Sequence, residues 1–412
     1  MIQTVENIGE KLVSMLTYDA SQPLIFSSGL FLFLFAGFLF FYGFTRRAPM
    51  ARIVYVILFS LYFYYKSSGI YFLLLVFASV SDYWIAHAIY KVRTQRAKYW
   101  LVGLSVLVNL GMLGYFKYTN FLIEIANNLF GQGFLNFQNI FLPVGISFFV
   151  FQSMSYTIDI YRGQLKPLNN WADYLFYLSF FPQLVAGPIV RAKDFIPQIR
   201  QNPLRVTREM FGMGVFLILI GLFKKAVISD YISLNFVDRI FDEPLLYSGF
   251  ECLMGIYGYA LQIYCDFSGY SDMAIGIALL LGFRFPKNFD APYKSATITE
   301  FWRRWHISLS TWLRDYLYIS LGGNRKGRIR TYFNLLVTML LGGLWHGAAV
   351  RFILWGALHG IALALHKLWL SVVPGSKATG AEMRWFWRIP GIFFTFNLVC
   401  FGWLMFRAES MK

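Results

Sequence analysis

A histidine in one of the most apolar stretches of the chain is the first candidate for chemistry. His346 lies in the sequence GGLWHG, residues 342–347. If its helix starts near Thr331, about fifteen residues at about 1.5 Å each place His346 about 22 Å into an apolar layer. An imidazole at that depth needs polar partners or a water-filled cavity. It is either a packed structural histidine or a base that accepts a proton from a hydroxyl as that oxygen attacks an acyl carbon.

Two carboxylates are the next most costly groups to bury. Asp266 and Asp272 lie in YCDFSGYSDMAIG, within the long apolar run 254–283. They could be hydrogen-bonded carboxylates at a helix break, or they could line a polar path. The structural interpretation is slightly favoured for each of them.

The other four histidines have weaker claims to chemistry. His87 and His366, near the ends of apolar runs, fit interfacial side chains with one satisfied nitrogen. His359 follows His346 by thirteen residues, which on one continuous helix would place the two on roughly opposite faces. His306 lies on the border of an aromatic stripe described below. The three cysteines form no CxxC pair, so we predict neither a metal cluster nor a disulfide framework.

Several familiar catalytic signatures are missing from the sequence. It contains no G-x-S-x-G, H-E-x-x-H, Walker or G-x-G-x-x-G motif. The sequence GGNRKG, residues 322–327, could hold phosphates through its backbone N–H groups. A basic cytoplasmic loop is the simpler interpretation of that segment.

The elements that position these residues are membrane helices. The chain is 57% hydrophobic and 14% charged, whereas soluble domains carry about a quarter charged residues. Strand-like alternation is absent, so we predict an all-α polytopic membrane protein with about ten to twelve membrane-embedded elements. The clearest apolar runs are 24–44, 53–65, 70–86, 100–116, 140–158, 211–224, 254–283, 332–344, 352–370 and 391–406.

The basic residues indicate the orientation of the chain. A formal net charge of +16 could suggest nucleic acid, but the charges lie in short loops between apolar runs. By the positive-inside rule these loops are cytoplasmic, so we expect membrane lipid and no nucleic acid as surroundings. The acidic leader, residues 1–23, lacks the basic region of a cleaved signal and predicts an outside N-terminus. We find no domain linker and treat 1–412 as one integral membrane domain.

Three segments depart from simple spans. The run 254–283 exceeds one span and predicts a broken, tilted or bent helix, while FFPQLVAGPIVR, residues 180–191, predicts an irregular piece covered by protein or water. Residues 297–327 predict an interfacial amphipathic helix with a capping box at Thr297 and Glu300, followed by a basic loop. On that helix Arg303, Ser310 and Arg314 lie opposite an aromatic stripe. The stripe consists of Phe301, Trp302, Trp305, Leu309, Trp312, Leu313 and Tyr316.

Long motifs in the chain resemble a known family. FWRRWHISLSTWLRDYLYISLGGNRKG and LLGGLWHGAAVRFILWGALHG look like the signature of the membrane-bound O-acyltransferases, in the branch of bacterial alginate O-acetyltransferase. YCDFSGYSDMAIGIALLLGFRFPKNF, FPQLVAGPIVR and ISFFVFQSMSYTIDIYRG also resemble that branch, and the likeness runs from about residue 24 to the end. The GGNRKG loop favours the polysaccharide-acetylating branch over the teichoic-acid D-alanyl transferases. Members of the branch commonly extend past the FRA at 406–408, so a role of such a tail is open.

The resemblance implies a fold and a chemistry. The fold would be a ring of helices around a thinned central region, with a funnel and tunnel reaching His346. His346 would be the catalytic histidine, and His306 would lie near the tunnel. Tunnel candidates are Trp305, Ser310, Trp345, Asp266 and Asp272, and Arg325, Lys326 and Arg328 are weak candidates for attracting the phosphates of coenzyme A.

It also implies a relay across a bacterial inner membrane. The acyl donor would be a cytoplasmic thioester, acetyl-CoA, which acts as a co-substrate without a metal. Its acetyl group would reach hydroxyls of an extracytoplasmic polysaccharide. A hydrolase-like extracytoplasmic acetyltransferase partner is expected to assist.

Other functions stay open at the level of the sequence. The same fold could acylate peptidoglycan or a teichoic acid, or carry a longer acyl group. An ion-coupled transporter could use Asp266, Asp272 and His346 as a path, although the inverted repeats common in transporters are not evident. A scaffold for a polysaccharide export complex is the third class.

Overall fold

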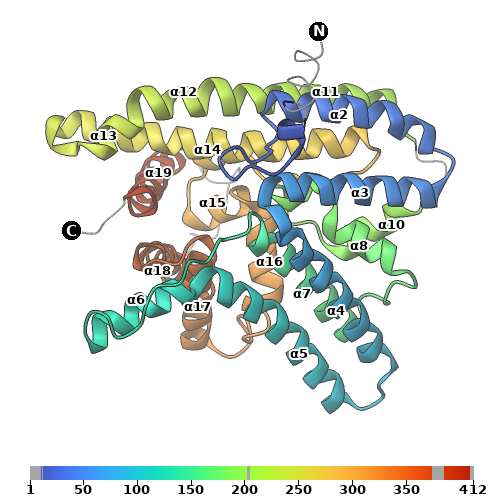
Figure 1. The fold of residues 1–412 in the computed structure, drawn as a ribbon. Helices are drawn as coiled ribbons and strands as arrows, with labels where there is room; N and C mark the ends of the chain where they lie inside the picture. Colours follow the sequence, from blue (N-terminus) through green and yellow to red (C-terminus); the bar gives the residue numbers. More distant parts are fainter. Residues whose placement is uncertain (1–10, 12, 202–204, 374–384, 409–412) are drawn as a thin grey trace, which may run out of the picture. The chain divides into compact units, whose positions relative to one another are not determined.

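Helices make up every regular element that the structure describes, which confirms the predicted all-α class (Figure 1). The computed structural model describes residues 11, 13–201, 205–373 and 385–408, so most of the acidic end of the leader lies outside the described residues. Five described helical segments are long and apolar enough to cross a membrane. They are Pro49–Lys91, Gln95–Phe130, Arg208–Asp242, Val350–Val372 and Trp385–Arg407.

The chain forms two compact units. Unit 1 comprises residues 1–120, 132–218 and 273–285, and unit 2 comprises residues 121–131, 219–272 and 286–412. Each is described by itself below, and the single membrane domain stays a prediction.

Unit 1 is built on three mutually packed helices, α4, α5 and α7, with α3 and α8 beside them (Figure 1). Aromatic rings fill the space around Phe181, whose ring lies 5.0 Å from that of Phe59 and 5.8 Å from that of Phe38. The helices of this unit are α2 Gly29–Tyr42, α3 Pro49–Ser68, α4 Phe72–Lys91, α5 Gln95–Leu113, α7 Ile146–Tyr161, α8 Trp171–Ser179, α9 Phe181–Leu184 and α10 Ala192–Ile199.

The segment 180–191 confirms the predicted irregular piece. Only the four residues of α9 are helical in its first part, and the stretch that follows has no regular structure. Gly187 lies so close to the backbone of Pro182 and Gln183 that a Cβ would collide with it. Most of the segment is buried, so protein covers this irregular backbone, as non-helical backbone at membrane depth requires.

The long apolar run forms α14, Gly249–Leu280, as one uninterrupted α-helix of 32 residues. The predicted break is therefore wrong. Glycines keep the helix close to the segment before it, because a Cβ at Gly269 would meet the backbone oxygen of Gly221 at 2.7 Å. The preceding segment is the irregular one: α11 Arg208–Leu222 passes through the π-helix η4 Phe223–Ser229 into α12 Asp230–Ile232 and, after another π-helix, α13 Asp238–Asp242.

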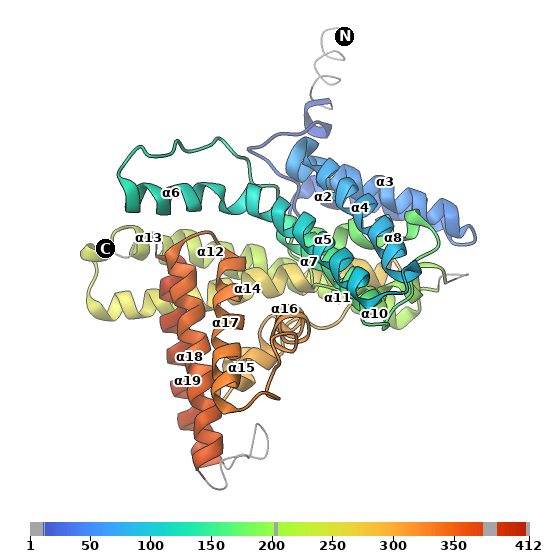
Figure 2. The same ribbon diagram turned by 90° about the horizontal axis from the view of Figure 1, so that it is seen from below.

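Unit 2 contains a three-helix stack of α17 Arg328–His346, α18 Val350–Val372 and α19 Trp385–Arg407, which Figure 2 shows side by side. Before the stack come α15 Ile298–Arg304, α16 Ile307–Trp312 and the π-helix η8 Leu313–Tyr318. The remaining helix, α6 Thr119–Phe130, was not among the predicted runs.

The helix predicted before the basic loop in 297–327 is not continuous, because the chain breaks at Trp305 and His306. Trp305 is extended, and His306 has φ +42°, so α16 starts in a new direction. The capping residue is confirmed, since the Thr297 hydroxyl accepts from the Glu300 N–H at 3.1 Å. The aromatic stripe is buried in the protein despite the break, and Arg303 and Arg314 are exposed as predicted.

Candidate functional site

His346 is the last residue of α17 and lies at a sharp turn into α18. Gly347 continues with extended backbone, and α18 begins at Val350. The glycines before and after the histidine permit this turn, because a Cβ on Gly343 would collide with the Phe352 carbonyl oxygen and one on Gly347 with the Phe352 ring. The predicted close approach of a second backbone is thus that of α18.

Aromatic rings surround the half-buried His346 imidazole. Ring centroids of Trp345, Trp355 and Phe406 lie 4.9, 5.1 and 5.2 Å from its own. These side chains come from α17, α18 and α19 in turn. The three-helix stack therefore surrounds one imidazole with aromatic rings.

His306 is fully buried at the break between α15 and α16. Its Nδ1 lies 3.3 Å from Oδ1 of Asn288, while its Nε2 has no hydrogen-bond partner within the described residues. Left-handed backbone at a residue other than glycine costs about 1 kcal/mol or more and persists only where surrounding contacts impose it. Strain of this kind is concentrated at functional sites.

The two histidines share one tryptophan. The Trp345 ring lies 5.8 Å from the His306 ring and 4.9 Å from the His346 ring. Burial, and secondly the nearby His346, lowers the pKa of His306 well below its ordinary value, so His306 is neutral near pH 7. Residues forty positions apart in sequence are thus brought to one site, as the sequence analysis expects of His306, Trp345 and His346.

Two of the predicted tunnel candidates, Ser310 and Trp305, lie in different surroundings. Ser310 lines a cavity of about 720 Å³ that Trp302 also lines. Trp305 is not among the residues that line it and packs in the core, with its ring 4.9 Å from that of Trp403. The cavity is bordered by Arg303, Arg314 and Lys367.

The cations that line this cavity are not those of the basic loop. Arg325, Lys326 and Arg328 are all exposed, and none of them lines the cavity. Arg328 belongs to the first turn of α17. The sequence analysis placed Arg303 and Arg314 on one polar side of the predicted helix, and this pattern was the signal for the cations of the cavity. It assigned the binding of coenzyme A phosphates to the basic loop instead.

Asp266 and Asp272 each form an ion pair with a lysine. Lys225 Nζ lies 2.6 Å from Asp266 Oδ1 and also 2.7 Å from Asp230 Oδ1. Lys224 Nζ lies 2.6 Å from Asp272 Oδ2. Both lysines belong to the π-helix η4, and the sequence analysis did not identify them as partners.

A third histidine joins the site from α18. His359 is fully buried, and neither ring nitrogen has a hydrogen-bond partner within the part of the chain that the structure describes. Its ring lies 4.7 Å from that of Trp355 and 5.3 Å from that of Trp302. The opposite faces considered for one continuous helix do not arise, because His346 ends α17 and His359 belongs to α18. Trp302, which lines the cavity, and Trp355, whose ring contacts that of His346, both contact His359 and also contact each other, with their ring centroids 5.7 Å apart.

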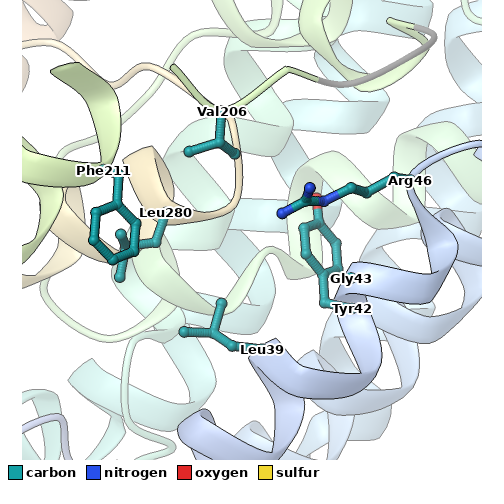
Figure 3. Close-up of a pocket in the computed structure, with 7 residues that line it drawn as sticks. All are labelled: Leu39, Tyr42, Gly43, Arg46, Val206, Phe211 and Leu280. Carbon is teal, nitrogen blue, oxygen red and sulfur yellow. The ribbon is translucent and has the colours of Figure 1, made fainter. Parts of the chain in front are cut away.

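Unit 1 has a smaller pocket of about 220 Å³, shown in Figure 3, and none of the predicted site residues lines it. Its walls are mostly apolar, with one cation: Leu39, Tyr42, Gly43, Arg46, Val206, Phe211 and Leu280. Across the described ranges, no group of three or more His, Cys, Asp or Glu residues is arranged to hold a metal ion.

Known proteins share both the sequence and its motifs. Residues 159–407 match the profile of MBOAT, the membrane-bound O-acyltransferase family. The chain is 45% identical to a "Probable alginate O-acetylase AlgI" of Azotobacter vinelandii, over 94% of this chain and 76% of that protein. It is 37% identical to a "Peptidoglycan O-acetyltransferase" of Helicobacter pylori, over 94% and 78%. It is 31% identical to a "Teichoic acid D-alanyltransferase" of Streptococcus thermophilus, over 77% and 78%.

These matches confirm the resemblance seen in the motifs. The histidines at 306 and 346 both fall inside the matched region. The family and the long apolar helices together make this an integral membrane enzyme that transfers acyl groups to oxygen. The chain belongs to the membrane-bound O-acyltransferase family.

Proposed function

We propose that this protein transfers an acetyl group from acetyl-CoA on the cytoplasmic side of a bacterial inner membrane to hydroxyls of an extracytoplasmic polysaccharide. The observation that carries the proposal is the juxtaposition of His306 and His346 around Trp345, in a chain similar along its length to a probable alginate O-acetylase. Acyl transfer between a thioester and a hydroxyl needs a base and little else, and an imidazole supplies one near pH 7.

The chemistry assigned to His346 is general-base catalysis. Its imidazole takes the proton of an acceptor hydroxyl while the hydroxyl oxygen forms a bond to the acyl carbon. The carbon–sulfur bond of the thioester then breaks, and the proton passes from His346 to the departing thiolate. The aromatic walls of Trp345, Trp355 and Phe406 limit the access of water, which would otherwise compete with the acceptor for the acyl carbon.

The donor is assigned to the cationic cavity. Arg303, Arg314 and Lys367 border a space of about 720 Å³ whose other walls are largely apolar. Guanidinium groups bind phosphates strongly, and an apolar wall suits a long uncharged arm. The phosphates of coenzyme A would lie at these cations, with the thioester end directed past Trp302 toward His359 and His346.

The acceptor side follows from the family resemblance. The proposal includes a funnel through a thinned ring of helices to His346, an extracytoplasmic N-terminus and a hydrolase-like partner that handles the polysaccharide. A membrane-embedded base solves the topological problem, because it meets a thioester from one side and a hydroxyl from the other.

A cell-based assay tests the acceptor and the sidedness together. Cells that lack the gene are complemented with the wild type, with His346→Ala or with the control His87→Ala, and ester-linked acetate is measured on exopolysaccharide and on peptidoglycan. We expect acetate on the exopolysaccharide with wild type and control, and none with His346→Ala at equal protein levels. Equal acetylation with His346→Ala would contradict the proposal.

A second acceptor is favoured by one specific observation. The relative from Helicobacter pylori is described as a peptidoglycan O-acetyltransferase and aligns with 94% of this chain. Acetate found on peptidoglycan and not on exopolysaccharide in the same assay would select this alternative, with the fold and the chemistry unchanged.

A further inference from the structure

Asn288 fixes the backbone on which His306 sits. Its carbonyl oxygen accepts from the Ile307 N–H at 2.9 Å, one residue after the left-handed His306. Its side-chain Oδ1 accepts from the Ser308 N–H at 3.1 Å and from the Ser308 hydroxyl at 2.9 Å. Asn288 is itself 1% exposed, and its Nδ2 donates to Ser271 Oγ at 3.1 Å. One asparagine therefore accounts for the strained turn between α15 and α16.

The orientation of the Asn288 amide follows from its partners. A backbone N–H can only donate, so the atom facing the Ser308 N–H is the amide oxygen and not the amide nitrogen. The donated bond from Nδ2 to Ser271 agrees with that orientation. The atom 3.3 Å from His306 Nδ1 is thus an acceptor.

The tautomer of His306 follows in turn. A neutral imidazole has one N–H and one lone pair, and Nδ1 can bond to an acceptor only as the N–H. Its Nε2 then carries the lone pair. This nitrogen is fully buried and has no hydrogen-bond partner among the described residues. The Phe267 ring, whose centroid lies 4.6 Å from that of His306, offers no N–H or O–H donor.

We infer that Asn288 is a positioning residue that holds His306 as the Nδ1–H tautomer, so that its Nε2 lone pair accepts a hydrogen bond from the hydroxyl of the acyl acceptor. This assignment rests on the proposed function, because it places the acceptor hydroxyl within reach of the two imidazoles that contact Trp345. It gives the two histidines separate tasks: His306 orients the hydroxyl, and His346 removes its proton.

A spectroscopic experiment tests the tautomer without any activity. The protein is labelled with ¹⁵N at histidine, and the His306 signals are assigned by their loss in His306→Gln. We expect a protonated Nδ1 and a bare Nε2 in the wild type near pH 7. A protonated Nε2 with a bare Nδ1 would overturn the assignment. The expected tautomer in a protein that transfers no acyl group would sink the proposed function and leave the role of Asn288 standing.

Two variants test whether Asn288 positions the His306 imidazole or only holds the backbone at the start of α16. Asn288→Ala removes the acceptor, so the Nδ1–H tautomer is no longer enforced and kcat/KM falls about 10–100-fold, as for other partners that orient a functional imidazole. Asn288→Asp keeps an acceptor for both Ser308 and His306, so the fold and the Nδ1–H are retained.

The Asp variant also makes a pH prediction with a defined sign. A carboxylate beside Nδ1 favours the imidazolium, which protonates Nε2 and removes its lone pair. The acid limb of the kcat/KM profile therefore moves to higher pH in Asn288→Asp, with activity recovered above that limb. His346 is the titratable neighbour that acts on His306, and it is unchanged in this variant. An unshifted acid limb with a retained fold would contradict the positioning role. Ser271→Ala, which leaves Oδ1 in place, is the matched control and should keep the wild-type tautomer.

Discussion

Two buried polar clusters in this protein are built in opposite ways. In unit 1 the carboxylate of Asp82, on α4, is fully buried and accepts hydrogen bonds from three side chains on α5 and α7. Ser105 Oγ donates at 2.7 Å, Asn109 Nδ2 donates at 2.6 Å, and Ser153 Oγ is the third donor. Ser153 also contacts the Tyr174 hydroxyl on α8 at 2.9 Å. The network ties four helices together.

The cluster of unit 2 around His306 and His359 contains buried nitrogen atoms that have no hydrogen-bond partner among the described residues. Among the described residues, His306 Nε2 and both nitrogens of His359 have no hydrogen-bond partner, and neither do the indole N–H groups of Trp302 and Trp355. Buried polar groups in folded proteins are nearly always paired, and each unpaired one costs about 1–3 kcal/mol. Around Asp82 the carboxylate is paired with three donors that hold helices together, although Asn109 Oδ1 has no partner among the described residues. A region that leaves its polar groups open is suited to receive the polar groups of a ligand.

The largest effect on stability is expected in the paired cluster. Asp82→Ala removes the acceptor of three buried donors, so we expect a loss of about 3 kcal/mol or more in unfolding free energy. Thermal unfolding in detergent measures it. Asp82→Asn, which keeps one acceptor oxygen, should lose less. An Asp82→Ala protein as stable as the wild type would remove the distinction between the two clusters.

A substitution in the histidine cluster is expected to change the stability little and to lower acyl transfer strongly. His359→Leu replaces an unpaired polar ring with an apolar side chain of moderate size, so stability should change by about 1 kcal/mol or less. Acyl transfer should nevertheless fall about tenfold or more, because His359 contacts both Trp302 and Trp355 beside the proposed donor path. A stable variant with full activity would show that the open nitrogens have no role with substrate.

The cations of the cavity should affect donor binding more than the chemical step. In Arg303→Gln or Arg314→Gln we expect KM for acetyl-CoA to rise about fivefold with little change in kcat. Arg325→Gln on the exposed loop is the matched control and should leave KM unchanged. If the loop variant raised KM and the cavity variants did not, phosphate binding would belong to the loop, as the sequence alone suggests.

The smallest effect concerns a surface pair next to Asn288. Lys287 Nζ donates to Asp290 Oδ1 at 2.6 Å, and this bond lowers the pKa of Asp290 below its ordinary value. The stabilisation is therefore present above the unfolded pKa of Asp290 and is lost as pH falls through the folded value. Both side chains are more than half exposed, so Lys287→Ala should cost about 0.5 kcal/mol or less at pH 7. Unfolding measured at pH 7 and in acid tests this, and a larger loss would mean that the pair braces the Asn288 turn.

Much of the helical framework could be predicted from the sequence. Apolar runs of about twenty residues have few alternatives in a membrane, so the runs before and after His346 were assigned to helices that the structure contains. The apolar stripe of 301–316 was also predicted, because apolar residues recur with helical spacing whether or not the helix is continuous. Its surroundings were not, since it was assigned to a membrane interface and is buried in the protein.

What was missed depends on contacts between residues far apart in the chain. The break at His306 is imposed by Asn288, eighteen residues earlier, and no local breaker such as proline or glycine marks it. The partners of Asp266 and Asp272 were missed because pairing with Lys225 and Lys224 requires knowing which helix lies alongside α14. The position of His359 near the same aromatic rings as His346 was missed because it depends on how α18 packs against α17 after the turn at 347–349.

The central claim is that acyl transfer takes place at His346, and single-turnover consumption of acetyl-CoA by purified protein with acceptor tests it most directly. The account predicts that His346→Ala slows release of coenzyme A by about 10²–10⁴-fold, the usual contribution of a general base. The variant should unfold at the same temperature as the wild type, and His87→Ala should react normally. Release at the wild-type rate from a folded His346→Ala protein would contradict the account.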